Sequence, residues 1–379
     1  MKILDFKLVK HITCLAVSAL ILSSALNIAY AADSQPRPED KPYYSEYKFT
    51  KSDNYLNIGV QPNYLPAGVI TAVMSRDLIL RRKLQEMGIT IVFYPFLTGR
   101  DVNKFFLSDD LQAGVAGEIP AITAASKKDV FIPAIMHQSP TSIVARRRVF
   151  IEELRGKRIG YSSTSTGHYA LLKTLSDAGI AEKDVTLVPL SREGMVAALV
   201  NNKIFAFSDI DLTVSLALKG YPEGAVIHRS LAFCYFYFSK EYYVKHPEAT
   251  RVVLAAEIKA VKWIASSGEN LFLAATWTKA DIQPLMEGTP DITTEQIVDI
   301  ADKNIMWQSE VPVIPENSLK IEGQIALMLK FLKGFGKIDS AVSTEKIIGS
   351  FDRKLIYDVH NMPDKYNLNE FHYDVKAVR

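Results

Sequence analysis

Residues 156–169 read GKRIGYSSTSTGHY, a pattern typical of a buried strand that runs into the N-terminus of a helix. We expect the strand over 158–161 and the helix over 167–178, ended by Gly179. Between them lie five consecutive hydroxyl side chains: Ser162, Ser163, Thr164, Ser165 and Thr166. Because a helix N-terminus exposes unpaired N–H groups and partial positive charge, this loop predicts a binding site for an anionic group. The alternative is that one hydroxyl caps the helix and the others are solvated.

The same alternation of strand and helix extends in both directions from this stretch. Upstream, a helix is expected over 68–86, and strands are expected at 55–60, 89–93, 112–116 and 130–136. Downstream, Ser191 is a plausible N-cap of another helix, and strands are expected at 185–188, 204–207 and 226–228. This spacing predicts an α/β protein of two lobes, each a mainly parallel sheet flanked by helices.

The last third of the chain has a different pattern. Residues 231–238, LAFCYFYF, are typical of a buried strand. From Pro247 onward the sequence indicates helices at 248–266, 269–278, 293–305 and 317–333. A helical C-terminal region is therefore predicted.

We expect the two lobes to be interleaved along the chain rather than consecutive. Lobe I is assigned to residues 53–145 and 231–335, and lobe II to residues 146–230, so the chain crosses twice, near Ala145 and Ser230. Residues 32–52 are expected to form an extended lead-in. Residues 336–379 are expected to form a C-terminal tail that packs on lobe I.

Residues 1–31 have the pattern of a secretory signal peptide. Three lysines precede the apolar residues 12–25, and Ala29 and Ala31 are the small residues of a cleavage site after Ala31. Export to the periplasm of a soluble protein is therefore predicted. The alternative, a retained N-terminal anchor, is disfavoured because a membrane span needs about 20 apolar residues.

Charge and cysteine content exclude other classes of protein. The chain has 44 Lys and Arg against 42 Asp and Glu, and the predicted signal peptide holds three Lys and one Asp, so the remainder is neutral. Nucleic-acid binding needs clustered excess cation and is not predicted. Cys234 is the one cysteine after the predicted signal peptide, so the core rather than a disulfide must stabilise the protein.

Several segments resemble the nitrate/sulfonate/taurine group of ABC transporter substrate-binding proteins, which have the type II periplasmic binding protein fold. They are LRGKRIG at 154–160, STGHY at 165–169, AAL at 197–199, IGVQ at 58–61 and GEIPA at 117–121. The resemblance covers most of residues 55–335. It implies a monomeric Venus-flytrap protein that closes on a small anionic or zwitterionic solute and delivers it to an ABC permease in the inner membrane.

The resemblance also implies which residues face the cleft between the lobes. Carried over position by position, the ligand-binding residues are Gln61, Asn63, Gly117, Glu118, Ser139, Thr141, Ser163, Thr164, Ser165, Thr166, His168 and Asp209. The aromatic residues Tyr64 and Phe233 are further candidates for an apolar wall. The alternatives are ordinary core for Phe233 and a packed helix residue for His168.

Two of these candidates are carboxylates, which bear on the charge of the solute. Similar proteins often have a Trp-x-Pro segment where this chain has Ser208-Asp209-Ile210-Asp211. If Asp209 and Glu118 both face the cleft, they disfavour a bare anion and suit the cationic group of a zwitterion. The alternatives are a surface turn for Asp209, a helix cap for Asp211 and a first-turn helix residue for Glu118.

The sequence shows no pattern that indicates catalysis, a metal or a cofactor. Neither G-x-S-x-G nor G-x-G-x-x-G occurs, and the histidines lack the spacing of metal ligands. The fungal thiamine-pyrimidine synthases share the fold that the resemblance implies, but those enzymes are cysteine-rich at their site. Two further functions stay open: a binding protein for a heteroaromatic vitamin precursor such as a thiamine pyrimidine, and a sensory or partner protein of the same fold.

Overall fold

A computed structural model describes residues 42–285, 292–305 and 311–376 of the chain. A single sheet of eight strands runs through it, in the order β2-β1-β3-β8-β4-β7-β5-β6. The strands are β1 (Tyr55–Val60), β2 (Thr90–Pro95), β3 (Ala113–Gly117), β4 (Val130–Ala145), β5 (Arg158–Tyr161), β6 (Thr186–Pro189), β7 (Ala206–Ile210) and β8 (Ala225–Ser239). The predicted signal peptide lies outside the described residues.

The sheet has two parallel halves joined by an antiparallel ribbon. β1 pairs in parallel with β2 and β3, and β5 pairs in parallel with β6 and β7. Between them β4 and β8 pair antiparallel along their whole length, and β3 and β7 pair antiparallel with their outer edges. The predicted α/β class with mainly parallel sheets is confirmed.

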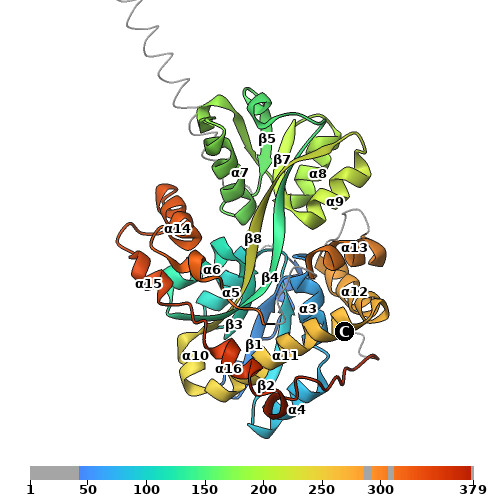
Figure 1. The fold of residues 1–379 in the computed structure, drawn as a ribbon, viewed down its shortest axis with the longest axis vertical. Coiled ribbons are helices and arrows are strands. Elements are labelled where there is room, and N and C mark those ends of the chain that lie inside the picture. Colours follow the sequence, from blue (N-terminus) through green and yellow to red (C-terminus); the bar gives the residue numbers. More distant parts are fainter. Residues whose placement is uncertain (1–41, 286–291, 306–310, 377–379) are drawn as a thin grey trace, which may run out of the picture.

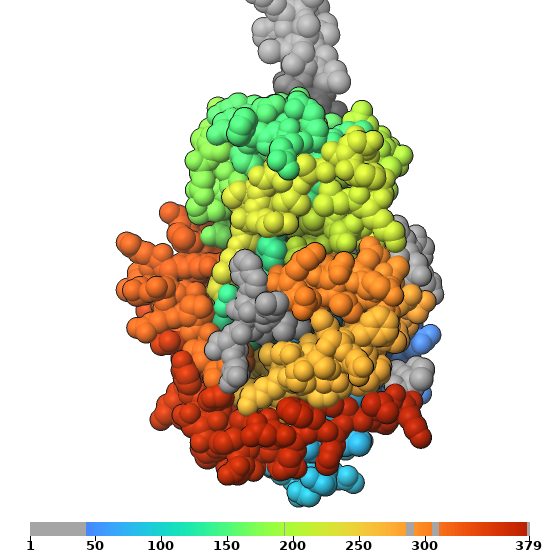
Figure 2. Space-filling view, turned by 45° about the vertical axis from the view of Figure 1, so that its right-hand side comes forward, coloured from blue at the N-terminus to red at the C-terminus, as the bar shows by residue number. Residues whose placement is uncertain are grey.

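Figure 1 shows the ribbon of β4 and β8 passing from a lower half, which holds β1, β2 and β3, to an upper half, which holds β5, β6 and β7. The space-filling view narrows between the upper mass, coloured green to yellow, and the lower one (Figure 2). The lobe boundaries predicted from the sequence stay a prediction, because both long strands belong partly to each half.

Two strand predictions were too short. The strand expected over 130–136 continues to Ala145, and the strands expected at 226–228 and 231–238 are one strand, β8. Polar residues in mid-ribbon, such as Ser139 and Arg229, interrupt the apolar pattern, although their backbones stay in the ladder through pairs such as Ser142 with Arg229. The pairing of two distant segments, which no local pattern encodes, extends these strands.

Helices cover both faces of the sheet. One face of the lower half packs against α3 (Ala67–Met74), α4 (Leu78–Glu86), α11 (Pro247–Ser266) and α12 (Gly268–Ile282). Its other face packs against α5 (Gly99–Leu107), α6 (Glu118–Lys127), α14 (Gln324–Gly334) and α15 (Thr344–Ile348). In the upper half α7 (Thr166–Asp177) covers one face, and α8 (Arg192–Val200) and α9 (Asp211–Gly220) cover the other.

The other α-helices of the described residues are α2 (Pro42–Ser45), α10 (Lys240–Lys245), α13 (Thr294–Ile305), α16 (Leu355–His360) and α17 (Pro363–Tyr366). The helical region predicted after Pro247 is therefore present. Within the lead-in, Tyr44 is buried and its hydroxyl donates to Asp101 Oδ2 over 3.0 Å. The C-terminal segment forms isolated bridges to the lower half at Phe351 and Tyr373.

The helix predicted over 68–86 is two helices, α3 and α4. Asp77 interrupts it as the N-cap of α4, since its Oδ1 accepts the N–H groups of Ile79 and Leu80 over 2.9 and 3.0 Å. The other carboxylate oxygen of Asp77 accepts from Lys259 Nζ of α11 over 2.7 Å, and both side chains are buried. A tertiary ion pair thus fixes a break that the helical periodicity conceals.

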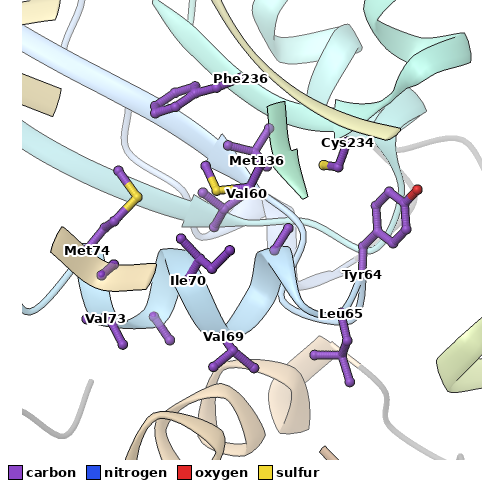
Figure 3. Packing of buried hydrophobic residues seen from close by; sticks show 14 of the residues in the cluster. Val60, Tyr64, Leu65, Val69, Ile70, Val73, Met74, Met136, Cys234 and Phe236 are labelled. Atoms are coloured by element: carbon purple, nitrogen blue, oxygen red, sulfur yellow. The ribbon is translucent and has the colours of Figure 1, made fainter. Parts of the chain in front are cut away.

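The larger hydrophobic cluster fixes α3 against the sheet, close to the turn that follows β1. Figure 3 shows Ile70 and Met74 of α3 packed beneath Val60, Met136 and Phe236 of the strands. Tyr64 lies at the end of this cluster beside Cys234, with its hydroxyl pointing away from the labelled apolar side chains. The core therefore holds the turn after β1 in place.

Candidate functional site

A cleft lies where the end of β1 and the end of β3 face the N-terminus of α7. From the lower half it is lined by Gln61, Tyr64, Arg100 and Gly117, and from the upper half by residues 162–167, Arg192 and Asp209. Its empty volume is about 560 Å³, including space open to solvent. Of the predicted site residues, the structure brings together Gln61, Tyr64, Gly117, Ser163, Thr164, Ser165, Thr166 and Asp209.

Residues 162–166, the hydroxyl loop, form the upper wall of the cleft. Ser165 is the N-cap of α7, and its Oγ accepts the His168 N–H over 3.1 Å and donates to the Ser162 carbonyl over 2.7 Å. Thr164 has φ +52°, a left-handed conformation that costs a non-glycine residue about 1 kcal/mol. One hydroxyl, that of Ser165, is therefore a helix cap, as the alternative interpretation of this loop predicted. The loop as a whole still faces the cleft.

Gly117 of the lower half lies close to the hydroxyl loop of the upper half. A Cβ atom at this position would stand 2.9 Å from Thr166 Oγ1 and 3.4 Å from Tyr64 Cε1. Any side chain here would occupy the space between the hydroxyl loop and the lower half. The cleft therefore depends on a glycine at position 117.

Arg192, the first residue of α8, was not among the residues expected from the sequence. Its Nε lies 3.2 Å from Asp209 Oδ2, and its Nη1 donates to the Leu97 carbonyl of the lower half over 3.0 Å. Arg192 is 17% exposed and Asp209 is 1% exposed, so the pair is largely removed from water. An arginine at the start of a helix does not by itself indicate a binding site, and only folding brings Arg192 close to Asp209.

Asp209 is committed to partners within the protein. Besides Arg192, it accepts the Thr213 hydroxyl over 2.7 Å. Arg100 lines the same cleft, so its lining includes two arginines and one aspartate. The local charge favours an anionic group in the cleft. Asp211 is not the cap of α9 but its first residue, and it accepts from Asn304 of α13 over 2.9 Å.

Neutral polar side chains lie just after β1, where Gln61 and Tyr64 are on the lining of the cleft and the predicted residue Asn63 is not. The side-chain amides of Gln61 and Asn63 both donate to the Leu97 carbonyl, over 3.4 and 3.1 Å. Asn63 Oδ1 and the Tyr64 hydroxyl are buried, and within the described part of the chain neither has a hydrogen-bond partner of normal geometry. Burial raises the pKa of Tyr64 well above its usual range, so the phenol stays protonated. Gln61 and Tyr64 therefore bring polar groups without charge to this side of the cleft.

Glu118 lies beneath the cleft rather than on its lining. It is fully buried, and its Oε1 accepts from Gln324 Nε2 of α14 over 2.7 Å. Burial raises the pKa of Glu118 well above its ordinary value, which favours the neutral acid. Its contact with α14 is specific to the tertiary structure, because the two residues are far apart in sequence.

Four other predicted residues lie in the central sheet or on α7. Ser139 and Thr141 are buried in β4, where His137 Nε2 lies 3.1 Å from Ser139 Oγ. Phe233 of β8 belongs to the hydrophobic cluster shared with α5 and α6. His168 is buried on α7 with its ring against Tyr161, Phe331 and Phe335. These four side chains are not on the lining of the cleft.

The described residues contain no group of three or more His, Cys, Asp or Glu side chains arranged to hold a metal ion. Within the same part of the chain, no helix is both long and apolar enough to cross a membrane.

Comparisons with known proteins agree with this architecture. Residues 85–270 match the family described as NMT1/THI5 like. The taurine-binding periplasmic protein of Escherichia coli (strain K12) is 32% identical over 118 residues, which cover 30% of this chain and 37% of that protein. The chain thus aligns with little more than a third of the length of this relative.

Solved structures of similar fold cover more of the chain. The alkanesulfonate-binding protein SsuA from Xanthomonas axonopodis pv. citri, bound to MOPS, has a TM-score of 0.59 at 17% identity, covering 79% of this chain and 98% of its own. The periplasmic nitrate-binding protein NrtA from Synechocystis PCC 6803 has a TM-score of 0.59 at 13% identity, covering 83% and 90%. At these identities the match shows the fold alone.

The fold is that of the two-lobed periplasmic substrate-binding proteins. The relatives named above are described as taurine-, alkanesulfonate- and nitrate-binding proteins. The resemblance expected from the sequence is therefore confirmed.

Proposed function

We propose that this chain is the periplasmic solute-binding component of an ABC importer and that it captures a small anionic solute, with a sulfonate as the preferred headgroup. The observation that carries the proposal is the cleft in which the hydroxyl loop at the N-terminus of α7 faces Arg192 and Arg100. Neutral hydroxyl donors, a helix N-terminus and guanidinium groups together suit a singly charged oxyanion. The named relatives bind taurine, alkanesulfonate and nitrate.

Binding is proposed to couple to closure of the two halves. The hydroxyl loop belongs to the upper half, whereas Gln61, Tyr64 and Gly117 belong to the lower one, so each half carries part of the site. A solute that contacts both halves stabilises the closed form relative to the open one. The closed form is then proposed to dock, as a monomer, on a permease in the inner membrane.

The charge of the cleft separates two solute classes. A zwitterion such as taurine needs a partner for its ammonium group, but Asp209 is already paired with Arg192, and Glu118 is turned toward α14. On the side of β1, the lining offers a donor group only the neutral side chains of Gln61 and Tyr64 among the described residues. We therefore propose that the anionic headgroup supplies most of the affinity, so that ethanesulfonate binds within about tenfold of taurine.

Thermal-shift screening followed by titration calorimetry tests the function. The panel is taurine, ethanesulfonate, nitrate, glutamate and a thiamine pyrimidine, because a solute that binds only the folded state raises the melting temperature. The expected result is stabilisation by the sulfonates. Binding of the pyrimidine alone would replace the proposed solute class with a heteroaromatic one, and no binding by any member would count against solute capture.

A substitution in the hydroxyl loop tests the site. Ser163→Leu places an apolar side chain in the cleft wall and is expected to weaken sulfonate binding by at least about tenfold, the value of one lost hydrogen bond. Ser176→Leu is the matched control, since Ser176 is exposed near the opposite end of α7. Equal affinity of the two variants would remove the hydroxyl loop from the site.

A further inference from the structure

Helix α14 is anchored to the lower half on the side of α6. Ile325, Met328, Leu329 and Leu332 are buried in the hydrophobic cluster that α14 shares with α5 and α6. At its first residue, Gln324 donates to the buried carboxyl of Glu118 over 2.7 Å. In Figure 1, α14 stands beside α6 and below α7. The helix is therefore fixed to one wall of the cleft and reaches toward the other half.

The far end of α14 contacts α7 through aromatic rings. The Phe331 ring lies 5.4 Å from the imidazole of His168 and 5.3 Å from the ring of Tyr169, and the Phe335 ring lies 5.1 Å from His168. Tyr161 approaches the same imidazole at 4.3 Å. The His168 ring is thus enclosed by three aromatic rings, and two of them come from the lower half: Phe331 of α14 and Phe335, the C-cap of α14.

His168 in turn holds the backbone of the hydroxyl loop. The Thr164 N–H donates to His168 Nδ1 over 3.2 Å, at the residue whose left-handed φ of +52° is unfavourable for a β-branched side chain. Because Nδ1 accepts, the imidazole is neutral and carries its proton on Nε2. A strained conformation persists only where its surroundings fix it, and this hydrogen bond is the contact that fixes the Thr164 N–H.

We propose that His168 is a positioning residue for the solute site and that α14 holds it there: Phe331 and Phe335 set the imidazole, and the imidazole sets the hydroxyl loop in its ligand-binding conformation. This inference rests on the proposed function of the loop. It gives the C-terminal helical region a part in binding, because the loop takes its ligand-binding shape fully only when α14 of the opposite half is in contact with α7.

The first test measures the conformation of the hydroxyl loop in the absence of any solute. His168→Phe keeps an aromatic ring in the cage but removes the acceptor, whereas His168→Asn keeps an acceptor atom at the δ position. Amide hydrogen exchange of Thr164, measured by NMR on the full mature chain, is expected to accelerate by about tenfold in His168→Phe, the value of one hydrogen bond, and by less than about threefold in His168→Asn. Leu327→Ala is the control, because Leu327 is exposed on α14.

A second variant leaves His168 in place. Phe331→Leu with Phe335→Leu keeps apolar packing but removes both rings, and it is expected to accelerate exchange at Thr164 as well. Exchange at Thr164 that is unchanged in both His168→Phe and the double variant would overturn the proposal. Equal acceleration in His168→Asn and His168→Phe would also overturn it, because ring packing rather than the Nδ1 acceptor would then be responsible.

The final readout is ethanesulfonate affinity, measured by titration calorimetry on the same variants. His168→Phe is expected to bind about tenfold more weakly than the parent, and His168→Asn within about threefold of it. An altered Thr164 exchange with unchanged affinity would overturn the role in binding. If the parent binds no sulfonate, the proposed function fails by itself, while the exchange experiment still decides whether α14 and His168 set the loop.

Discussion

The pair of Arg192 and Asp209 gives the sharpest prediction about the cleft, because it serves both stability and binding. We predict that Arg192→Gln lowers the free energy of unfolding and weakens binding of a sulfonate. The carboxylate of Asp209 is 1% exposed, and removing the guanidinium deprives it of its cationic partner. The neutral hydroxyl of Thr213 still donates to this carboxylate. It also removes the hydrogen bond to the Leu97 carbonyl in the lower half.

The magnitude follows from the geometry. At 3.2 Å and an effective dielectric constant of about 20, the Coulomb attraction between the two charges is about 5 kcal/mol. Desolvation offsets much of this attraction, and the 17% exposure of Arg192 lets water screen part of the rest. We therefore expect Arg192→Gln to cost about 2–4 kcal/mol of unfolding free energy, near the range measured for breaking buried pairs.

A double-mutant cycle separates the pair from its surroundings. Asp209→Asn is expected to lower the free energy of unfolding by about 1–2 kcal/mol. The loss is small because the Thr213 hydroxyl still has an acceptor and the Arg192 guanidinium remains partly hydrated. The loss of unfolding free energy in the double variant is expected to be smaller than the sum of the two single losses by at least about 1 kcal/mol. Urea unfolding at neutral pH measures all four proteins, and losses that add to within about 0.5 kcal/mol would refute the reasoning.

Two further predictions concern the buried carboxyl group of Glu257 and the space for a side chain at position 117 of the cleft. Glu257 of α11 is fully buried, neither carboxylate oxygen has a hydrogen-bond partner among the described residues, and burial raises the pKa of Glu257 well above 4.5. The folded protein therefore keeps this proton while the unfolded chain releases it, so stability should fall above about pH 4.5 by up to about 1.4 kcal/mol per pH unit. Urea unfolding of Glu257→Gln at pH 5, 6 and 7 should lack this decline, and parallel curves for the two proteins would argue against a buried neutral acid. Gly117→Val should weaken sulfonate binding by at least about tenfold with little change in melting temperature, since its Cβ would stand 2.9 Å from Thr166 Oγ1. Calorimetric titration that gives the parent affinity would contradict the cleft geometry.

Local sequence patterns predicted the elements that local chemistry defines. The strand at 158–161 and the helix that follows it are present, and Ser165 and Ser191 cap α7 and α8. Gly179 follows the end of its helix with positive φ, as a glycine permits. Each of these features depends on a few consecutive residues, which is why the sequence alone reveals it.

The errors arose where distant segments determine the structure. The long strands β4 and β8 exist because they pair with each other, and the break between α3 and α4 is fixed by the ion pair of Asp77 with Lys259. No window of sequence contains both partners of such a contact. The periodic pattern over 68–86 is compatible with one helix or two, and only the tertiary contact selects between them.

The site divides in the same way. The sequence by itself determined the α/β class, the hydroxyl loop at a helix N-terminus and the group of proteins that the chain resembles, because these follow from residues adjacent in the chain. Only the tertiary structure decided the electrostatics of the cleft: it brought Arg192 to Asp209, turned Glu118 toward Gln324 and set His168 against α14. The physical reason is that a charge acts through its neighbours in space, and folding chooses those neighbours from anywhere in the chain.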